Sequence, residues 1–195
     1  GSKHKNLCPC SSWSPMRLNQ KRVGGFKMAK VITFSRTFPA HHPKAGQPTY
    51  FVEKFYNSLF SRNNLMDYPK GLEINEDILE MKNHTIRAGN RWKKGECFSP
   101  RVWSGKPYNS NQIILAKDTL ITDVYDFEIK GAHKMLPLDY DTDITINHKC
   151  FHTDSEIMKL VAKNDGLTLA ELLQWFKFPK PFEGQIICWN QQVNY

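Results

Sequence analysis

A short stretch in the middle of the chain, Lys82-Asn-His-Thr-Ile-Arg87, brings together side chains that could carry out acyl transfer. The hydroxyl of Thr85 would become a nucleophile if a neighbouring base accepted its proton. Lys82 could be that base if burial or a nearby cation such as Arg87 lowered its pKa. A carboxylate at Asp165 could then orient the lysine or relay a proton to the leaving amine. The candidate catalytic residues are therefore Lys82, Thr85 and Asp165.

The spacing of these residues places a condition on the backbone. Side chains alternate along a strand, so positions 82 and 85 of a regular strand would point to opposite faces. Both could reach one pocket only if the chain bent near Asn83-His84, where we expect a helix ending at Met81 to meet the strand. Each residue also has an ordinary role open to it, since a strand lysine is usually solvated, threonine favours strands, and Asp before Gly commonly forms a turn.

A cluster of basic and aromatic residues surrounds this stretch. Residues 82–108 contain seven Lys or Arg against one acid, Glu96, together with two tryptophans and a tyrosine. A local basic patch can hold phosphate, and an exposed aromatic ring can stack on a base. Alternation puts Arg101 and Trp103 on one strand face with Val102 toward the core, so Trp103 is the preferred stacking candidate, although each aromatic could equally be a core residue. The binding candidates in this region are Arg87, Arg91, Lys93, Lys94, Arg101, Trp103, Ser104 and Lys106.

Overall charge says less about partners than this local cluster does. The chain has 195 residues and a formal charge of +8, and its first 30 residues contain seven basic residues and no acid. The remaining 165 residues therefore carry 20 basic and 19 acidic groups, close to neutral. We expect residues 1–27 to be a tag remnant or a disordered basic tail, with a nucleic-acid-binding arm as the alternative, and residues 28–195 to form one domain.

Several classes of protein and of site are not supported. The five cysteines are odd in number and lack CxxC spacing, and the histidines lack finger-like spacing, so we assign no disulfide framework, no metal and no cofactor. No apolar run is long enough for a membrane span, and no signal-peptide core is evident. We expect a cytoplasmic protein without a membrane partner.

The elements that must position these residues show a mixed pattern. Val31 to Phe34 reads as a buried strand, followed by a proline-rich loop. Residues 50–60 place Phe51, Val52, Phe55, Leu59 and Phe60 on one helical face, and Asn75 is expected to cap a short helix. Six later segments are short, β-rich and bounded by turn residues: 84–88, 96–103, 112–118, 120–129, 143–148 and 184–190. Such strands favour a small closed or nearly closed barrel flanked by helices, an α+β fold.

Two helices are expected between the last two strands. Thr153 with Glu156 and Thr168 with Glu171 both have capping-box spacing, which marks helix starts. Gly166 can take the left-handed conformation that ends the first helix. Asp165 would then sit at a tight corner between the two helices.

Together these motifs resemble the ASCH family, which has a PUA-like β-barrel. The resemblance rests on Lys82-Asn-His-Thr-Ile-Arg87, on Trp92-Lys-Lys-Gly-Glu96 leading into Phe98-Ser-Pro-Arg-Val-Trp103, and on Asp165-Gly-Leu-Thr-Leu-Ala-Glu-Leu172. The opening strand with Phe34-Ser-Arg-Thr-Phe38 is also similar and adds Arg36 to the binding candidates. It covers residues 30–38 and 80–190, with residues 39–79 as a helical insertion. Asp165 stands where the family enzymes carry Glu.

The resemblance implies a pocket for a modified nucleoside, nucleotide or RNA base. Small bacterial ASCH amidohydrolases release acetate from N4-acetylcytidine, so metal-free amide hydrolysis is the leading hypothesis, with Thr85 as nucleophile and Lys82 as base. A non-catalytic RNA-binding module is the alternative. A protein-interaction domain is a further alternative, favoured if Phe51, Phe55 and Phe60 are exposed.

Overall fold

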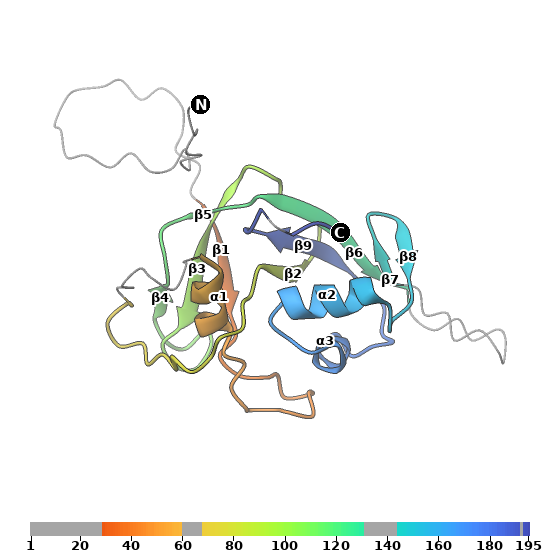
Figure 1. The fold of residues 1–195 in the computed structure, drawn as a ribbon. Coiled ribbons are helices and arrows are strands. Elements are labelled where there is room, and N and C mark those ends of the chain that lie inside the picture. The colour runs from red at the N-terminus through yellow and green to blue at the C-terminus, as the bar shows by residue number, and fades with distance from the viewer. Residues whose placement is uncertain (1–28, 60–67, 131–143, 192) are drawn as a thin grey trace, which may run out of the picture.

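The computed structural model describes residues 29–59, 68–130, 144–191 and 193–195 (Figure 1). In these residues the chain is α+β, with two sheets and three helices. The first sheet contains β1 (Lys30–Phe34), β3 (Cys97–Trp103), β4 (Gln112–Ile114) and β5 (Thr119–Leu120). The second contains β2 (His84–Ala88), β9 (Phe182–Cys188), β6 (Asp123–Ile129), β7 (Ile144–Ile146) and β8 (Lys149–Phe151). The helices are α1 (Phe51–Leu59), α2 (Glu156–Asn164) and α3 (Leu169–Trp175).

The first sheet is built around β3. Strand β1 pairs with it in parallel, with Phe34 opposite Val102, and β4 and β5 pair with it antiparallel. Alternation turns Ile32, Phe34, Phe98 and Val102 into the core, where all four are buried. The predicted inward direction of Val102 is therefore confirmed.

The second sheet has the order β2-β9-β6-β7-β8, with every neighbouring pair antiparallel. One face carries Ile86 and Phe127, and α2 and α3 lie beside this face in Figure 1. Phe127 lies 5.9 Å from Phe176, just beyond α3, measured between ring centroids. The opposite face of β2 carries Thr85 and Arg87, because neighbouring strand residues point in opposite directions.

In the described residues, the two sheets are joined by the backbone on one side and by a side-chain hydrogen bond from Arg87 on the other. The chain runs from β5 through Ile121 and Thr122 into β6, and Thr122 N donates to Cys188 O in β9. Strands β1 and β2 each end their sheet, and Arg87 Nη2 donates to Thr33 O across the gap at 2.8 Å. The described strands thus form two sheets and no closed ring of paired strands.

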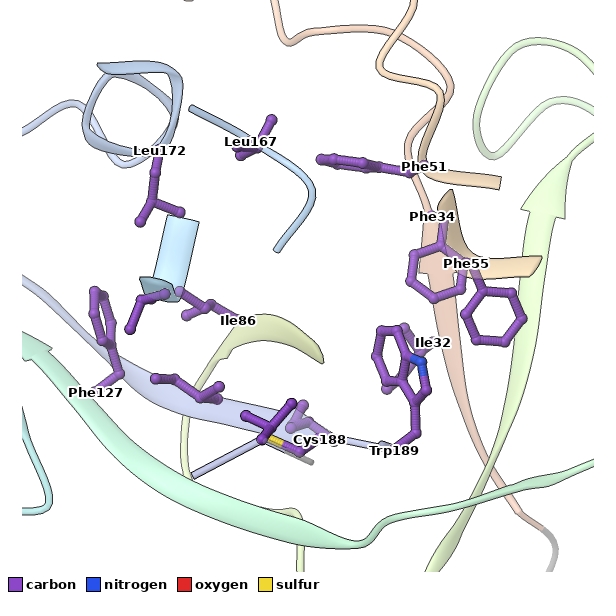
Figure 2. Close-up of a cluster of buried hydrophobic side chains, with 14 of the residues drawn as sticks. Ile32, Phe34, Phe51, Phe55, Ile86, Phe127, Leu167, Leu172, Cys188 and Trp189 are labelled. Carbon is purple, nitrogen blue, oxygen red and sulfur yellow. The ribbon is translucent and has the colours of Figure 1, made fainter. Parts of the chain in front are cut away.

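Helix α1 matches the predicted amphipathic helix. Phe51, Val52 and Phe55 are buried and Leu59 is half-buried, while Phe60 lies outside the described residues. In Figure 2, Phe55 lies with Phe34 and Trp189, at ring-centroid distances of 4.9 Å and 5.3 Å. Exposure of Phe51, Phe55 and Phe60 would favour the protein-interaction alternative, and the burial of Phe51 and Phe55 does not favour it.

The short helix expected after Asn75 is absent from the described residues 68–83, so that prediction was wrong. Asn75 Oδ1 accepts from Asp77 N at 3.0 Å, and Ile78 N donates to Asn75 O. The side chain that would cap a helix closes an Asx turn instead. The chain therefore reaches Lys82 through an irregular segment, and not from a helix ending at Met81.

The helix starts expected before α2 and α3 had different outcomes. Ser155, and not Thr153, caps α2, because its side chain accepts from Met158 N. Thr168 and Glu171 form the predicted capping box of α3. Gly166 has a φ of 76°, as expected for the residue that ends α2.

Strand β8 was not predicted. It pairs with β7 through a turn at Asn147 and His148, which have positive φ values of 46° and 65°. Two consecutive positive φ values are typical of the type I′ hairpin turn, for which Asn-His is a less common sequence than Asn-Gly. No helix in the described part of the chain has the length and apolarity needed to cross a membrane.

Candidate active site

The Lys82 side chain lies inside the protein and meets Asp165. Its exposed fraction is 1%, and Nζ lies 2.6 Å from Asp165 Oδ1 and 2.7 Å from the Asp165 carbonyl oxygen. Asp165 itself is 6% exposed and is the C-cap of α2. The sequence named both residues as catalytic candidates, and the structure brings them together across 83 positions of the chain.

Backbone contacts fix this pair from two sides. Lys82 N donates to Lys54 O in α1, and Asn83 N donates to Asn164 O at the end of α2. Gly166 follows the carboxylate, where a Cβ would lie 3.0 Å from Lys54 Cδ and 3.5 Å from Lys82 Cβ. A glycine is required there both by this close packing and by its positive φ.

Burial dominates the electrostatics of the pair. It lowers the pKa of Lys82 to about 8, because the ammonium loses its hydration, although the Asp165 carboxylate opposes the change. Arg87 and Lys54 are further cations that lower the pKa of Lys82. Burial also raises the pKa of Asp165 against the opposing effects of Lys82 and Arg87. Both groups are thus shifted toward their neutral forms.

Helix α1 supplies two contacts that were not predicted. The Phe51 ring lies 4.0 Å from Lys82 Nζ, measured to its centroid, and Lys54 Nζ donates to Gly166 O at 2.8 Å. The segment interpreted as an insertion therefore packs directly on the pair. Lys54 lies on the polar side of an amphipathic helix, and nothing in its local sequence distinguishes it from a solvated lysine.

Thr85 is buried in β2, opposite Ile187 of β9, and is 2% exposed. Within the described residues its hydroxyl has no hydrogen bond, and none joins it to Lys82. Lys82 lies before β2 and is therefore not bound by the alternation of side chains along that strand. Its ammonium group, however, is bound to Asp165. The structure thus assembles two of the three predicted catalytic residues and leaves the threonine hydroxyl uncommitted.

The buried pair interacts with side chains on both faces of β2. Arg87 is half-buried, binds Thr33 O and lowers the pKa of Lys82 from one face. His84 lies on the other face, is 0% exposed, and has its Nε2 atom 3.8 Å from Asp165 Oδ1. His84 Nδ1 lies 2.6 Å from the Tyr195 hydroxyl. His84 was not predicted as a site residue, although it lies within Lys82-Asn-His-Thr-Ile-Arg87.

The other predicted binding residues occupy separate places. Arg91, Lys93 and Lys94 are exposed just before β3, and Lys94 Nζ lies 2.8 Å from Asp123 Oδ2. Ser104 and Lys106 are exposed just after β3. A seven-residue strand spans about 20 Å, so these two basic groups lie at opposite ends and do not line one groove.

An aromatic pair marks the far end of β3. Trp103 is half-buried and Tyr108 is 87% exposed, with 5.4 Å between their ring centroids. Arg101 shares the outward face, where it donates to Ser99 Oγ and Gln112 Oε1. Trp92, by contrast, is a core residue with 2% exposure.

Three hollows lie on the described surface. The largest, about 610 Å³, is bordered by Arg36, the start of α1 and residues 72–77. The others, about 480 Å³ and 380 Å³, lie at the Glu183–Gly184 end of β9 and beside Thr122 and Asp123. Lys82, Thr85 and Asp165 line none of these three, which fits the burial of the pair beneath Phe51.

Comparisons of this chain with family models, with curated proteins and with solved structures found no match. Among the described residues, no group of three or more His, Cys, Asp or Glu side chains is arranged to hold a metal ion.

Proposed function

We propose that this chain is an ASCH-type amidohydrolase that removes an acyl group from N4-acetylcytidine-like substrates. The observation that carries the proposal is the buried Lys82–Asp165 pair, in which the pKa of Lys82 is lowered to about 8. A solvated lysine is protonated at neutral pH and cannot act as a base, whereas a lysine with this pKa is partly neutral. The α+β fold, with two sheets connected through β5 and β6, agrees with the coarser part of this proposal.

In the proposed reaction Thr85 attacks the amide carbonyl. A bond forms between Thr85 Oγ1 and the acyl carbon while the hydroxyl proton passes to the neutral amine of Lys82. The carbon–nitrogen bond then breaks, and the leaving amine takes a proton from Lys82. Water hydrolyses the resulting ester to acetate and restores Thr85. For the first step, Lys82 Nζ turns from Asp165 toward Thr85, so the observed pair is the resting arrangement.

Acetate release from N4-acetylcytidine tests this proposal. The matched variants are Thr85→Ser, which keeps the hydroxyl, and Thr85→Val, which keeps the shape without it. We expect release by the wild type and by Thr85→Ser, and none above background by Thr85→Val. Circular dichroism shows whether each variant is folded. A wild type without activity, or a Thr85→Val variant with wild-type turnover, would contradict the proposal.

Lys82 needs a more careful substitution because its partner is buried. Removing one member of a buried ion pair costs about 3 to 5 kcal/mol, so the fold itself is at risk. Lys82→Met preserves volume and Phe51 contact better than Lys82→Ala. We expect a folded Lys82→Met protein to release no acetate, and wild-type-like hydrolysis by it would remove Lys82 as the base.

A second candidate function, a non-catalytic RNA-binding module, is favoured by the Trp103–Tyr108 pair beside the exposed Lys106. An exposed ring next to a cation suits base stacking, worth about 1 to 3 kcal/mol per base. The test is quenching of tryptophan fluorescence by single-stranded RNA at low and high salt. Tyr108→Ala should weaken binding, with Lys180→Ala as a surface control. Absence of salt-dependent quenching would remove this candidate.

A further inference from the structure

His84 is a buried titratable residue that the proposed reaction does not use. Its ring is 0% exposed, and Nε2 has no hydrogen-bond partner in the structure. A buried polar atom left unpaired costs about 1 to 3 kcal/mol. The carboxylate oxygen Asp165 Oδ1 lies 3.8 Å from Nε2.

A series of hydrogen bonds determines which ring nitrogen carries the proton. Asn190 Nδ2 donates to Asn83 Oδ1, and Asn83 Nδ2 donates to Asn164 Oδ1. Asn164 Nδ2 then donates to the Tyr195 hydroxyl at 3.0 Å. The Tyr195 hydroxyl lies 2.6 Å from His84 Nδ1, and because it already accepts from Asn164 we assign it as the donor in this contact. With Nδ1 as acceptor, the proton of a neutral His84 is on Nε2, the nitrogen that faces Asp165.

The surroundings keep His84 neutral. Burial lowers the pKa of His84 well below its usual range, and the positive charge of Lys82 acts in the same direction. The charged and titratable groups around this region include Lys54 of α1, Arg87 of β2, Tyr125 of β6, Cys188 of β9, Asp165 after α2, and Tyr195. Burial also raises the pKa of the Tyr195 hydroxyl, which keeps its proton available to Nδ1.

We propose that His84 is a positioning residue for the Asp165 carboxylate, donating from Nε2–H when Lys82 Nζ turns away from Asp165 toward Thr85. This inference rests on the proposed function and adds a residue to it. In the resting arrangement, Lys82 Nζ lies 2.6 Å from Asp165 Oδ1, and His84 Nε2 lies 3.8 Å from the same oxygen. The proposal requires the carboxylate to move closer to Nε2 than this resting distance.

A second donor to Asp165 is useful because a buried carboxylate without a partner is costly in free energy. When Lys82 contacts Thr85, the carboxylate loses its closest donor in a site with little water. A hydrogen bond to a charged group contributes about 1.5 to 3 kcal/mol, which partly replaces that contact. His84 thus lowers the free energy of the arrangement in which Lys82 acts as base, and it does not touch substrate.

The first test is the position of the proton, measured by 15N NMR of the imidazole at neutral pH. We expect a protonated Nε2 and an unprotonated Nδ1 in the wild type. Tyr195→Phe, which removes the hydroxyl donor, should abolish the preference for this tautomer. A wild-type ring protonated at Nδ1, or at both nitrogens, would overturn the proposal.

The second test uses two amide variants that differ in where the amide lies. His84→Gln places an NH₂ group near the position of Nε2, whereas His84→Asn reaches only the position of Nδ1. Titration of the Asp165 carboxyl carbon by 13C NMR should show a higher pKa in His84→Asn than in His84→Gln, because a lost donor disfavours the carboxylate. Equal pKa values in the two variants would overturn the proposal.

Kinetics give a readout that a purely structural role would not produce. We expect kcat to fall about tenfold in His84→Asn and to stay within about threefold of wild type in His84→Gln, with KM unchanged in both. Equal kcat values in the two variants would contradict the positioning role. If the wild type releases no acetate, the proposed function fails, whereas the tautomer and the Asp165 titration still decide whether His84 faces the carboxylate as a donor.

Discussion

The most informative single residue is Lys82, because opposing effects act on one ammonium group. The Asp165 carboxylate favours the charged form, yet burial has the larger effect and lowers the pKa to about 8. Lys54 and Arg87 add to the lowering. The lysine is thereby held near the pKa that suits a general base at neutral to mildly alkaline pH.

The pH dependence of turnover follows from this balance. A base must be neutral, so kcat/KM for acetate release should rise through about pH 8 and level off above it. Because Lys54 lowers the pKa of Lys82, Lys54→Met should move this rise to higher pH, whereas Lys54→Arg should leave it in place. The measurement is a pH profile of kcat/KM for the three proteins. A rise that stays in place or moves to lower pH in Lys54→Met would contradict the role of Lys54.

At the scale of elements, local signals located most helices and strands but not all of their ends. The helical spacing of apolar residues in α1 and the alternation of inward and outward side chains in β3 involve residues close together in the sequence. Both could therefore be predicted from the sequence. Asn75 and Thr153 show the limit, because the same polar side chains close turns and cap helices. Strand β8 was missed because it contains three residues and follows an uncommon turn sequence.

The start of α2 offers a direct comparison between the sequence expectation and the structure. Ser155 Oγ accepts from Met158 N, whereas Thr153 precedes the cap. Ser155→Ala should therefore lower the free energy of unfolding by about 1 kcal/mol, and Thr153→Ala by less than about 0.5 kcal/mol. Urea denaturation of both variants measures the difference. A larger loss of unfolding free energy in Thr153→Ala than in Ser155→Ala would indicate that Thr153 is the cap.

At the scale of the whole molecule, the site depends on contacts between residues far apart in the chain. Lys82 and Asp165 could be named from their motifs, but their meeting requires α1, α2 and β2 to pack together. Phe51, Lys54 and Tyr195 were missed for the same reason, since each reaches the pair only through tertiary structure. Most of the predicted binding residues are exposed, but they lie at two ends of β3, and this arrangement depends on the fold.

The burial of this pair has a consequence for the stability of the whole protein. Lys82 has a pKa of about 8 when folded and its usual value of 10.5 when unfolded, so between these values the unfolded chain binds more protons. Stability must then rise with pH across this window, by about 1.4 kcal/mol per pH unit from this one group.

Urea denaturation at several pH values between about 8 and about 9.5 measures this effect. The reference is the double variant Lys82→Met/Asp165→Leu, which removes both charges and so leaves neither one buried alone. Burial is the largest cause of the raised pKa values of Cys188 and Tyr195, and it is common to both proteins, so most of their effect cancels in the difference. The stability of the wild type relative to the double variant should increase by about 2 kcal/mol over this range. A difference that is independent of pH would mean that Lys82 keeps an ordinary pKa in the folded protein, and it would remove the physical basis for a lysine base in this site.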